Sequence, residues 1–164
     1  MAAAACLLDS IRVADLPTVA RLFSEPKVRS FLGGPVDPQI AQQRAAELAQ
    51  QARAWAVRPN PGNSSLLGIV VLDQHHDLQD LEVSYLFLPE HWGRGYATET
   101  VHQVLAHAFG IMRLRRVVAE TQSANAPSVR LLERLGFRLL RSVSRFGAEQ
   151  SIYLAEPPFF HAAT

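Results

Sequence analysis

The sequence has 164 residues, of which 48% are hydrophobic and 19% are charged, and its formal net charge is +1. This length and composition exclude a mostly disordered chain and predict a single compact domain over residues 1–164. A net charge so close to zero argues against strong electrostatic attraction to nucleic acid, which we do not expect as a partner.

The first half of the chain is expected to contain two helices and three strands. Apolar residues at helical spacing predict the first helix, and Asp37 followed by Pro38 supplies the cap and first turn of the second. The expected elements are a strand beginning at Asp9, a helix from about Leu16 to Ser24, a helix from Asp37 to about Gln51, and paired strands at Ala54–Val57 and Leu66–Leu72.

The second half alternates strands and helices without a repeat or a domain boundary. Pro89 stops the first strand of this half, and Gly136 is placed to end the last helix. The expected elements are a strand at Glu82–Leu88, a helix beginning near Tyr96, a strand at Leu114–Thr121, a helix at Ala126–Leu135, and strands at Phe137–Ser144 and Ser151–Ala155. The order predicts a mixed α/β protein.

Cysteine content and hydropathy exclude several further classes. Cys6 is the only cysteine, so no intrachain disulfide, thiolate zinc cluster or Cys-x-x-Cys pair is expected. We place it in a loose terminus without a catalytic role, because no neighbour is suited to lower its pKa. No apolar run reaches the roughly 20 residues of a membrane helix, and residues 1–8 lack the basic stretch of a signal peptide. We expect a cytoplasmic protein without a membrane partner.

A turn with two glycines separates the strand ending at Leu88 from the helix beginning near Tyr96. Gly93 and Gly95 lack a Cβ, so they permit unusual dihedral angles and let a ligand approach the backbone. The unpaired amides at the start of the helix attract anions, and Arg94 adds a positive charge. The turn is a candidate pyrophosphate site, and an ordinary structural turn is the alternative.

A dinucleotide-binding turn of the Rossmann type is a competing interpretation. Glu120 follows a second strand about 25 residues after Gly95, as that interpretation requires. We set it aside because the third glycine of the Rossmann fingerprint falls on Thr98. The turn also lies halfway along the chain instead of opening a repeated βαβ array.

Two short blocks carry the most specific signal. The segment 92–99 reads Trp-Gly-Arg-Gly-Tyr-Ala-Thr-Glu, and the segment 125–137 contains Asn-x-x-Ser and ends in Leu-Gly-Phe. The first resembles the acetyl-CoA pyrophosphate loop of the Gcn5-related N-acetyltransferase (GNAT) family, with Gly95 and Ala97 at its last two fixed positions. Trp92 replaces the usual Gln or Arg, as in the branch similar to ribosomal-protein N-terminal acetyltransferases. The second resembles the helix that follows in the same family.

This resemblance implies a fold and a co-substrate. The fold is a twisted mixed β-sheet, flanked by helices, whose two central strands splay apart to admit acetyl-CoA. The pyrophosphate would bind the backbone of Gly93, Arg94, Gly95, Tyr96, Ala97 and Thr98, and the pantetheine arm would meet the backbone of Leu86, Phe87 and Leu88 and the side chain of Asn125. The reaction implied is transfer of an acetyl group to a primary amine by direct attack, without a protein nucleophile.

The resemblance also suggests which residues move protons. Glu82 occupies the strand position where related N-terminal acetyltransferases carry a glutamate that takes the amine's proton. The alternative is an exposed strand carboxylate. Leu132 replaces the tyrosine that protonates the leaving thiolate in many members, so Ser128 is the substitute acid, with helix capping as its alternative role. Tyr85 and Tyr153 are reserve candidates, although strand aromatics usually pack in the core.

The acceptor is the least constrained part of the prediction. The motif resemblance favours the α-amine of a protein, and a small amine such as a polyamine, an amino acid or an aminoglycoside is the alternative. By the same resemblance, residues 31–37 and 145–150 would line the acceptor site. A non-catalytic acyl-CoA binding module is the hypothesis from another class, since the leaving-group tyrosine is missing.

Other chemistries find little support. His75 and His76 are adjacent and His102 and His107 are five apart, which is no ligand spacing, so we expect no metal. There is no Gly-x-Ser-x-Gly elbow of a serine hydrolase. Arginines crowd the carboxyl half, and a solvated face explains them. We expect a monomer or homodimer, with Pro157–Phe160 as a candidate contact surface.

Overall fold

The computed structural model describes residues 5–61 and 65–158. The helices and strands described are β1 (Cys6–Ser10), η1 (Val13–Asp15), α1 (Leu16–Ser24), α2 (Pro26–Arg29), α3 (Pro38–Ala49), β2 (Ala54–Pro59), β3 (Gly68–Gln74), β4 (Leu81–Phe87), η2 (Pro89–His91), α4 (Tyr96–Gly110), β5 (Val117–Gln122), α5 (Ala126–Arg134), β6 (Arg138–Arg145) and β7 (Ala148–Ala155). They confirm a mixed α/β protein.

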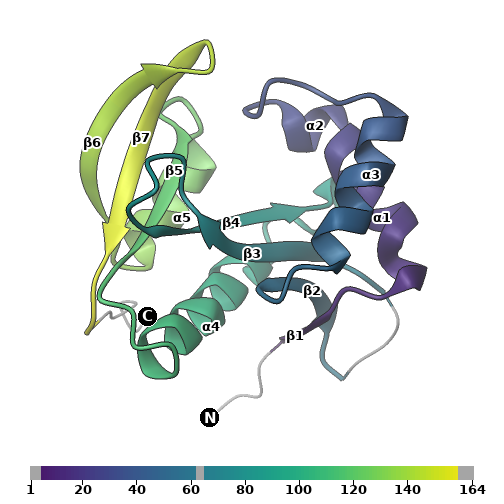
Figure 1. Ribbon diagram of the computed structural model, residues 1–164, viewed down its shortest axis with the longest axis horizontal. Helices are drawn as coiled ribbons and strands as arrows, with labels where there is room; N and C mark the ends of the chain where they lie inside the picture. Colours follow the sequence, from purple (N-terminus) through teal and green to yellow (C-terminus); the bar gives the residue numbers. More distant parts are fainter. Residues whose placement is uncertain (1–4, 62–64, 159–164) are drawn as a thin grey trace. The chain divides into compact units, whose positions relative to one another are not determined.

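The strands form a seven-stranded sheet in the order β1-β2-β3-β4-β5-β7-β6 (Figure 1). The pairs β1–β2, β2–β3, β5–β7 and β6–β7 are antiparallel, whereas β4 and β5 are parallel. Glu82 opposite Val118 is the only register pair described between β4 and β5. The splayed central strands implied by the family resemblance stay a prediction.

The chain divides into two compact units, each of which draws on both halves of the sequence. Unit 1 takes the described parts of residues 1–71 and 85–100, and unit 2 takes those of 72–84 and 101–164. Strands β3 and β4 and helix α4 contribute residues to both. The single domain expected over residues 1–164 stays a prediction.

Unit 1 contains the amino-terminal helices and their core. Helix α1 buries Val19 and Leu22 completely, and it packs along α3. These side chains join apolar residues of the strands, because alternate positions of β2 and β3 point into the same core. The buried core comprises Ile11, Val19, Leu22, Ala45, Ala54, Ala56, Leu66, Ile69, Val71 and Leu88. This core includes Ile69 and Val71 of β3, and Leu88, which directly follows β4.

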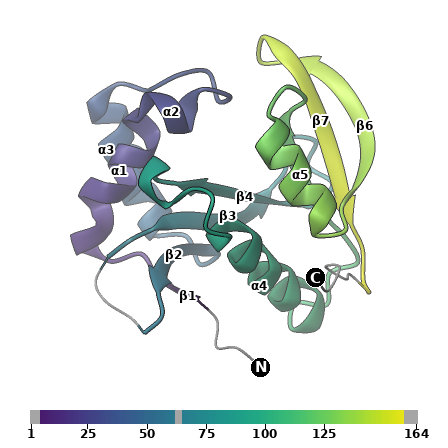
Figure 2. The same ribbon diagram turned by 180° about the vertical axis from the view of Figure 1, so that it is seen from behind.

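Unit 2 is built on the antiparallel strands β5, β7 and β6. Ala119 of β5 lies opposite Tyr153 of β7, which in turn pairs with Leu139 of β6. Helix α5 packs against β5, and Figure 2 shows α5 on the near side of β7. Gly136, at φ +88°, ends α5 as predicted, and the Phe137 amide closes the turn on the Leu132 carbonyl at 3.0 Å.

Several boundaries differ from those predicted. The first strand begins at Cys6 and not at Asp9. Strand β5 begins at Val117 and not at Leu114, since Arg113 adopts φ +58° and the Leu114 amide bonds back to Ala108. The four-residue helix α2 was not expected. Phe159 and Phe160 of the proposed contact surface lie outside the described residues.

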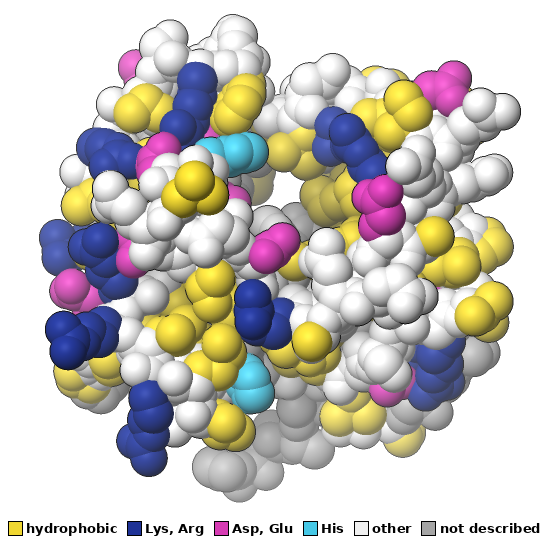
Figure 3. Space-filling model, viewed as in Figure 1, with side chains coloured by type: hydrophobic (Ala, Val, Ile, Leu, Met, Phe, Trp, Pro, Cys, Tyr) yellow, Lys and Arg dark blue, Asp and Glu magenta, His cyan; other side chains and the backbone are white. Residues whose placement is uncertain are grey.

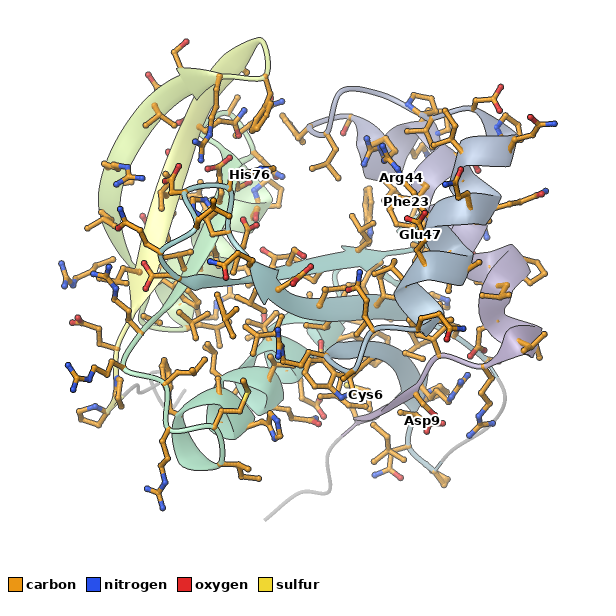
Figure 4. The ribbon with its side chains drawn as sticks, in the orientation of Figure 1. Cys6, Asp9, Phe23, Arg44, Glu47 and His76 are labelled. Carbon is orange, nitrogen blue, oxygen red and sulfur yellow. The ribbon has the colours of Figure 1, made fainter. Side chains whose placement is uncertain are left out.

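Cys6 is not in a loose terminus, so that prediction was wrong. It opens β1, where its side chain has no exposed surface and its amide donates to Glu99 Oε1 at 3.2 Å (Figure 4). Burial, followed by the charge of Glu99, raises the pKa of the Cys6 thiol to about 12. A thiol with this pKa carries almost no thiolate at neutral pH, which agrees with the absence of a catalytic role.

Gly68 at the start of β3 lies directly against the backbone of β4. A Cβ built at this position would come within 2.4 Å of the Leu86 carbonyl oxygen and 2.7 Å of Cδ1 of Phe87. We expect Gly68→Ala to cost about 2 kcal/mol of unfolding free energy, because a backbone oxygen cannot move aside as a flexible side chain does. Chemical denaturation of the purified variant measures this cost.

Gly110 provides the matched control for this substitution. It lies at the end of α4, and a Cβ there would meet nothing within 4 Å. Gly110→Ala should therefore leave stability unchanged within about 0.5 kcal/mol. Equal stability of the Gly68→Ala and Gly110→Ala variants would contradict the close approach of β3 and β4 at Leu86.

Candidate active site

The glycine turn of unit 1 leads directly into α4. Gly93 and Gly95 have φ of +73° and +80°, which favour glycine, and a Cβ at either would meet nothing within 4 Å. The glycines are thus required by backbone conformation, and the space in front of them is open. The amide of Glu99 is the first to bond back into the helix, at 3.0 Å from the Gly95 carbonyl.

The amides that precede Glu99 form the anion-binding end of α4. In the described residues, no backbone acceptor is found for the amides of Tyr96, Ala97 and Thr98. Unpaired amides at a helix start carry partial positive charge and bind phosphate oxygens. Arg94 is exposed beside them. The turn has the geometry that a pyrophosphate requires.

Trp92 fixes this turn from its amino-terminal side. Its indole Nε1 donates to the Phe87 carbonyl at 2.8 Å, and its amide donates to the Pro89 carbonyl at 3.2 Å. Arg21 of α1 holds the same segment by pairing with both oxygens of Glu90, at 2.7 and 3.2 Å. The backbone of the turn is therefore ordered by contacts within unit 1.

The end of β4 supplies the residues expected to meet the pantetheine arm. Phe87 and Leu88 are buried, and Leu86 is partly buried against the unit 1 core. The Leu88 amide donates to the Leu67 carbonyl at 3.2 Å, and the Leu88 carbonyl accepts from His91 at 2.9 Å. The Leu88 amide is therefore engaged within the fold, and the pantetheine contacts expected at Leu86, Phe87 and Leu88 stay predictions.

Glu82 lies on β4 within unit 2, half-buried beside β5. Its Oε2 accepts a hydrogen bond from the Glu120 amide at 3.0 Å. Burial raises the pKa of Glu82, and the positive charge of His75 opposes this rise. A carboxylate whose pKa is raised toward neutrality accepts a proton more readily than an exposed one.

Glu82 belongs to a charged cluster that we define as His75, Asp77, Glu82, Glu120 and Arg145. His75 and Glu120 are 3% and 7% exposed, and His75 Nε2 lies 3.1 Å from Glu120 Oε1. Arg145 Nη1 lies 3.0 Å from Asp77 Oδ1, and Arg145 also pairs with Glu120. Basic, acidic and histidine side chains lie beside one another over this part of unit 2 in Figure 3.

Sequence reasoning missed the roles of His75 and Glu120 in this cluster. From the sequence we weigh His75 only as a metal ligand beside His76, and Glu120 only as the acidic residue of a Rossmann-type unit. One signal was available, because Glu120 interrupts the apolar run Val117–Ala119 of a central strand. A carboxylate in such a strand is usually paired. In the described part of the chain, no group of three or more potential ligands has the geometry for a metal ion.

Asn125 and Ser128 form the amino-terminal cap of α5. Asn125 Oδ1 accepts from the Ser128 amide at 3.4 Å. Capping is therefore one role of this pair. The capping bond uses neither the side-chain NH2 group of Asn125 nor the hydroxyl group of Ser128. Leu132, at the position of the missing tyrosine, is 1% exposed. A core leucine there cannot protonate a thiolate.

The reserve tyrosines differ in their surroundings. Tyr153 of β7 is 5% exposed, and burial followed by the charge of Glu133 raises its pKa. Tyr85 on β4 is half-buried. Packing in the core explains Tyr153. Ser128 remains the first candidate for the residue that protonates the leaving thiolate.

Comparison with known proteins identifies a family. The family model described as Acetyltransferase (GNAT) domain matches residues 6–138. An uncharacterized N-acetyltransferase of Bacillus subtilis (strain 168), YoaA, is 28% identical over 141 residues, which cover 80% of this chain and 78% of YoaA. An uncharacterized N-acetyltransferase of Bacillus licheniformis, p20, is 22% identical over 142 residues, covering 80% of this chain and 78% of p20.

Solved structures share the fold. A GNAT-family acetyltransferase from Bacillus anthracis has a TM-score of 0.81 at 22% identity, covering 92% of this chain and 94% of the other. Spermidine N-acetyltransferase from Vibrio cholerae, solved with CoA and spermine, has a TM-score of 0.77 at 18% identity, covering 94% and 96%. The described helices include none with the length and apolar character needed to span a membrane.

Proposed function

The chain belongs to the GNAT acetyltransferase family, and from this premise we propose that it transfers the acetyl group of acetyl-CoA to the α-amine of a peptide or protein. That it is an acetyl-CoA-dependent N-acetyltransferase follows from its relatives. The acceptor and the roles of individual residues are the proposal. Acetyl-CoA binding is carried by the Gly93–Thr98 turn, whose open glycines and unpaired helix amides fit a pyrophosphate. The acceptor assignment rests on the arginines near residues 31–37.

The residues of the turn and of β4 hold and polarise the thioester in this proposal. The amides of Tyr96, Ala97 and Thr98 bind the pyrophosphate, and the Leu86 backbone aligns the pantetheine arm. Acetyl-CoA supplies an activated acetyl group, on which a backbone donor stabilises developing negative charge. The Asn125 amide group, which the cap bond at Oδ1 leaves available, is our candidate for a second pantetheine contact.

Two proton transfers accompany the reaction. The acceptor arrives as an ammonium ion, and Glu82 takes one proton from it, directly or through a water molecule. The neutral nitrogen then forms the C–N bond while the C–S bond breaks. The Ser128 hydroxyl stabilises the departing thiolate by a hydrogen bond. The nitrogen then loses its second proton, and the thiolate gains one to become the released thiol.

The charges near the expected acceptor loop favour a peptide amine over a polyamine. Arg29 Nε and Nη2 donate to the Gly34 and Leu32 carbonyls at 2.9 and 2.6 Å, so this arginine shapes residues 31–37. Arg44 lies over the Phe23 ring at 5.8 Å (Figure 4). Burial, followed by the charge of Arg44, lowers the pKa of Arg29. Two neighbouring arginines repel a polycation.

The acidic residues Asp37 and Glu47 of the same region are bonded to neutral donors and not to these arginines. Asp37 caps α3 by accepting from the Gln39 amide at 2.9 Å, and Glu47 accepts from Gln43 at 3.0 Å. Among the described residues, neither Arg29 nor Arg44 forms a salt bridge. An acceptor with one ammonium group and a nearby carboxylate, such as an amino acid, is the second candidate that these arginines favour.

A thiol-release assay across acceptors tests this proposal. We expect kcat/KM for amino-terminal peptides to exceed that for spermidine and for aminoglycosides by about 10-fold or more, which corresponds to about 1.4 kcal/mol. Nα-blocked peptides are the matched control, since they lack only the reacting amine. A preference for spermidine would overturn the peptide assignment, and binding of acetyl-CoA without turnover of any amine would favour a non-catalytic module.

A further inference from the structure

His75 is a buried histidine held by a tight turn between β3 and β4. Its amide donates to the Asp80 carbonyl and its carbonyl accepts from the Leu78 amide, both at 2.9 Å. The side chain is 3% exposed and its Nε2 lies 3.1 Å from Glu120 Oε1. Since an ionised carboxylate only accepts hydrogen bonds, the contact with Glu120 requires the proton on Nε2. Arg145 Nη2 lies 3.4 Å from the same nitrogen and, as a donor, cannot bond to it in that state.

The second ring nitrogen has a partner in either protonation state. Nδ1 lies 3.4 Å from the Asp77 amide, which donates to it when the ring is neutral. It also lies 3.5 Å from Asp77 Oδ2, which accepts from it when the ring is charged. His75 can therefore gain a proton on Nδ1 without losing its contact with Glu120.

The charges of the acids and arginines around His75 show which negative charge a proton on His75 Nδ1 would balance. Asp77 is paired with Arg141 and Arg145, and Glu120 is paired with Arg145. These two acids and two arginines cancel. In residues 5–61 and 65–158 Glu82 has no salt bridge to an arginine or lysine, and its hydrogen-bond donor is the neutral Glu120 amide. An ionised, half-buried carboxylate without a counter-charge is costly.

We propose that His75 is a positioning residue that supplies the counter-charge of ionised Glu82, held in place by Glu120 and Asp77. The proposal rests on the proposed function, in which Glu82 accepts the amine's proton. Both side chains meet Glu120: His75 Nε2 lies 3.1 Å from its carboxylate, and Glu82 Oε2 accepts from its amide at 3.0 Å. In agreement with this placement, burial raises the pKa of Glu82 and the charge of His75 limits the rise.

The titratable and charged groups around His75 come from every neighbouring segment. They are Glu82 of β4, Glu120 of β5, Arg141 and Arg145 of β6, and Asp77 and His76 of its own turn. His76 is exposed, and its ring lies 5.1 Å from that of Phe146. The two adjacent histidines therefore differ mainly in burial and in contact with Glu120.

This difference allows a paired test by NMR titration of the Glu82 side-chain carboxyl carbon in the full-length protein. In His75→Gln, which keeps a donor for Glu120 and removes the charge, the titration midpoint of Glu82 should rise by about 1 pH unit. The charge of His76 also lowers the pKa of Glu82, as the last and smallest of its causes, so in His76→Gln the midpoint should rise by less than about 0.3 unit. An unchanged midpoint in His75→Gln would overturn the proposal, even if the variant were less stable.

A measurement on the unmutated protein keeps the test independent of variant folding. The ring-nitrogen shifts of His75 should show an imidazolium over the pH range in which Glu82 becomes ionised. A ring that is neutral throughout that range would refute the counter-charge role. Neither readout requires turnover, so both remain valid if the acceptor or the catalytic role of Glu82 is wrong, and those failures appear in the kinetics of Glu82→Gln.

Discussion

Replacing Gly95 by valine is expected to abolish measurable acetyl-CoA binding, with a loss of affinity of at least about 100-fold, or about 2.7 kcal/mol. Gly95 has φ of +80°, which a β-branched residue adopts only with strain. The branched side chain would also occupy the open space before the amides of Tyr96 and Ala97. Isothermal titration calorimetry with acetyl-CoA measures the effect directly.

Gly147 is a matched control for Gly95→Val. It lies between β6 and β7 at φ +77°, and a Cβ there would meet nothing within 4 Å. Gly147→Val therefore imposes a similar backbone strain in a turn that we do not assign to the co-substrate. It should retain acetyl-CoA affinity within about 2-fold. Unchanged affinity of Gly95→Val for acetyl-CoA would show that the glycine turn does not belong to the acetyl-CoA site.

Glu82→Gln is expected to lower kcat by roughly 100-fold or more, while acetyl-CoA affinity stays unchanged. The amide oxygen of glutamine can still accept from the Glu120 amide, so the local structure should persist. What the variant loses is the ability to take up a proton. Steady-state kinetics with the best amine acceptor, together with calorimetry for acetyl-CoA, separates catalysis from binding.

The pH dependence of Glu82→Gln has a definite sign. Burial raises the pKa of Glu82. The kcat/KM of the unmutated enzyme should therefore decrease as the pH is lowered, and the midpoint of this acidic limb should lie above the ordinary pKa of glutamate. This limb should be absent from Glu82→Gln. A raised folded-state pKa also means that ionisation of Glu82 destabilises the fold as the pH rises through that value. Glu82→Gln should therefore be at least as stable at neutral pH.

Glu156→Gln serves as the control for removal of a carboxylate. Glu156 pairs with Arg138 at 3.2 Å, and its side chain is 50% exposed. We expect its kinetics and pH profile to match those of the unmutated protein. Equal turnover of Glu82→Gln and Glu156→Gln across the pH range would take Glu82 out of the mechanism.

The parts of the fold that sequence predicted well are those specified by local interactions. Helix α4 begins at Tyr96 after the two glycines, and α5 is bounded by Asn125 and Gly136, as their capping preferences predict. Helix α2 was missed because four residues are too few to show a helical period. The late start of β5 depends on Arg113, whose φ of +58° lies in the left-handed region. Glycine and asparagine are the residues that usually mark this conformation, and neither occurs at this position.

The candidate site was only partly predictable for a different reason. The glycine turn is contiguous in sequence, whereas His75 and Glu120 are 45 residues apart and meet only through the fold. Likewise, the environment of Glu82 depends on the Glu120 amide and on burial by neighbouring strands. Cys6 shows the converse error, because a short apolar segment near the terminus pairs with β2 as an edge strand and buries Cys6.

The family is established, whereas the ribosomal-protein N-terminal branch is not shown by the comparisons. Trp92, which suggested that branch, bonds to the Phe87 carbonyl and so has a structural role in ordering the turn. A tryptophan in place of the usual Gln or Arg is therefore explained by its hydrogen bond within the turn, without reference to a particular acceptor. We keep the peptide acceptor as a proposal that rests on the arginines near residues 31–37.

Calorimetric titration of the purified protein with acetyl-CoA, beside NAD and ATP, tests the central claim most directly. We predict saturable binding of one acetyl-CoA per chain, with affinity for NAD and ATP at least about 10-fold weaker. Both share the pyrophosphate but lack the pantetheine arm, which we assign to β4. Equal binding of all three, or no binding of acetyl-CoA, would contradict the assignment of the Gly93–Thr98 turn and of β4 to this co-substrate.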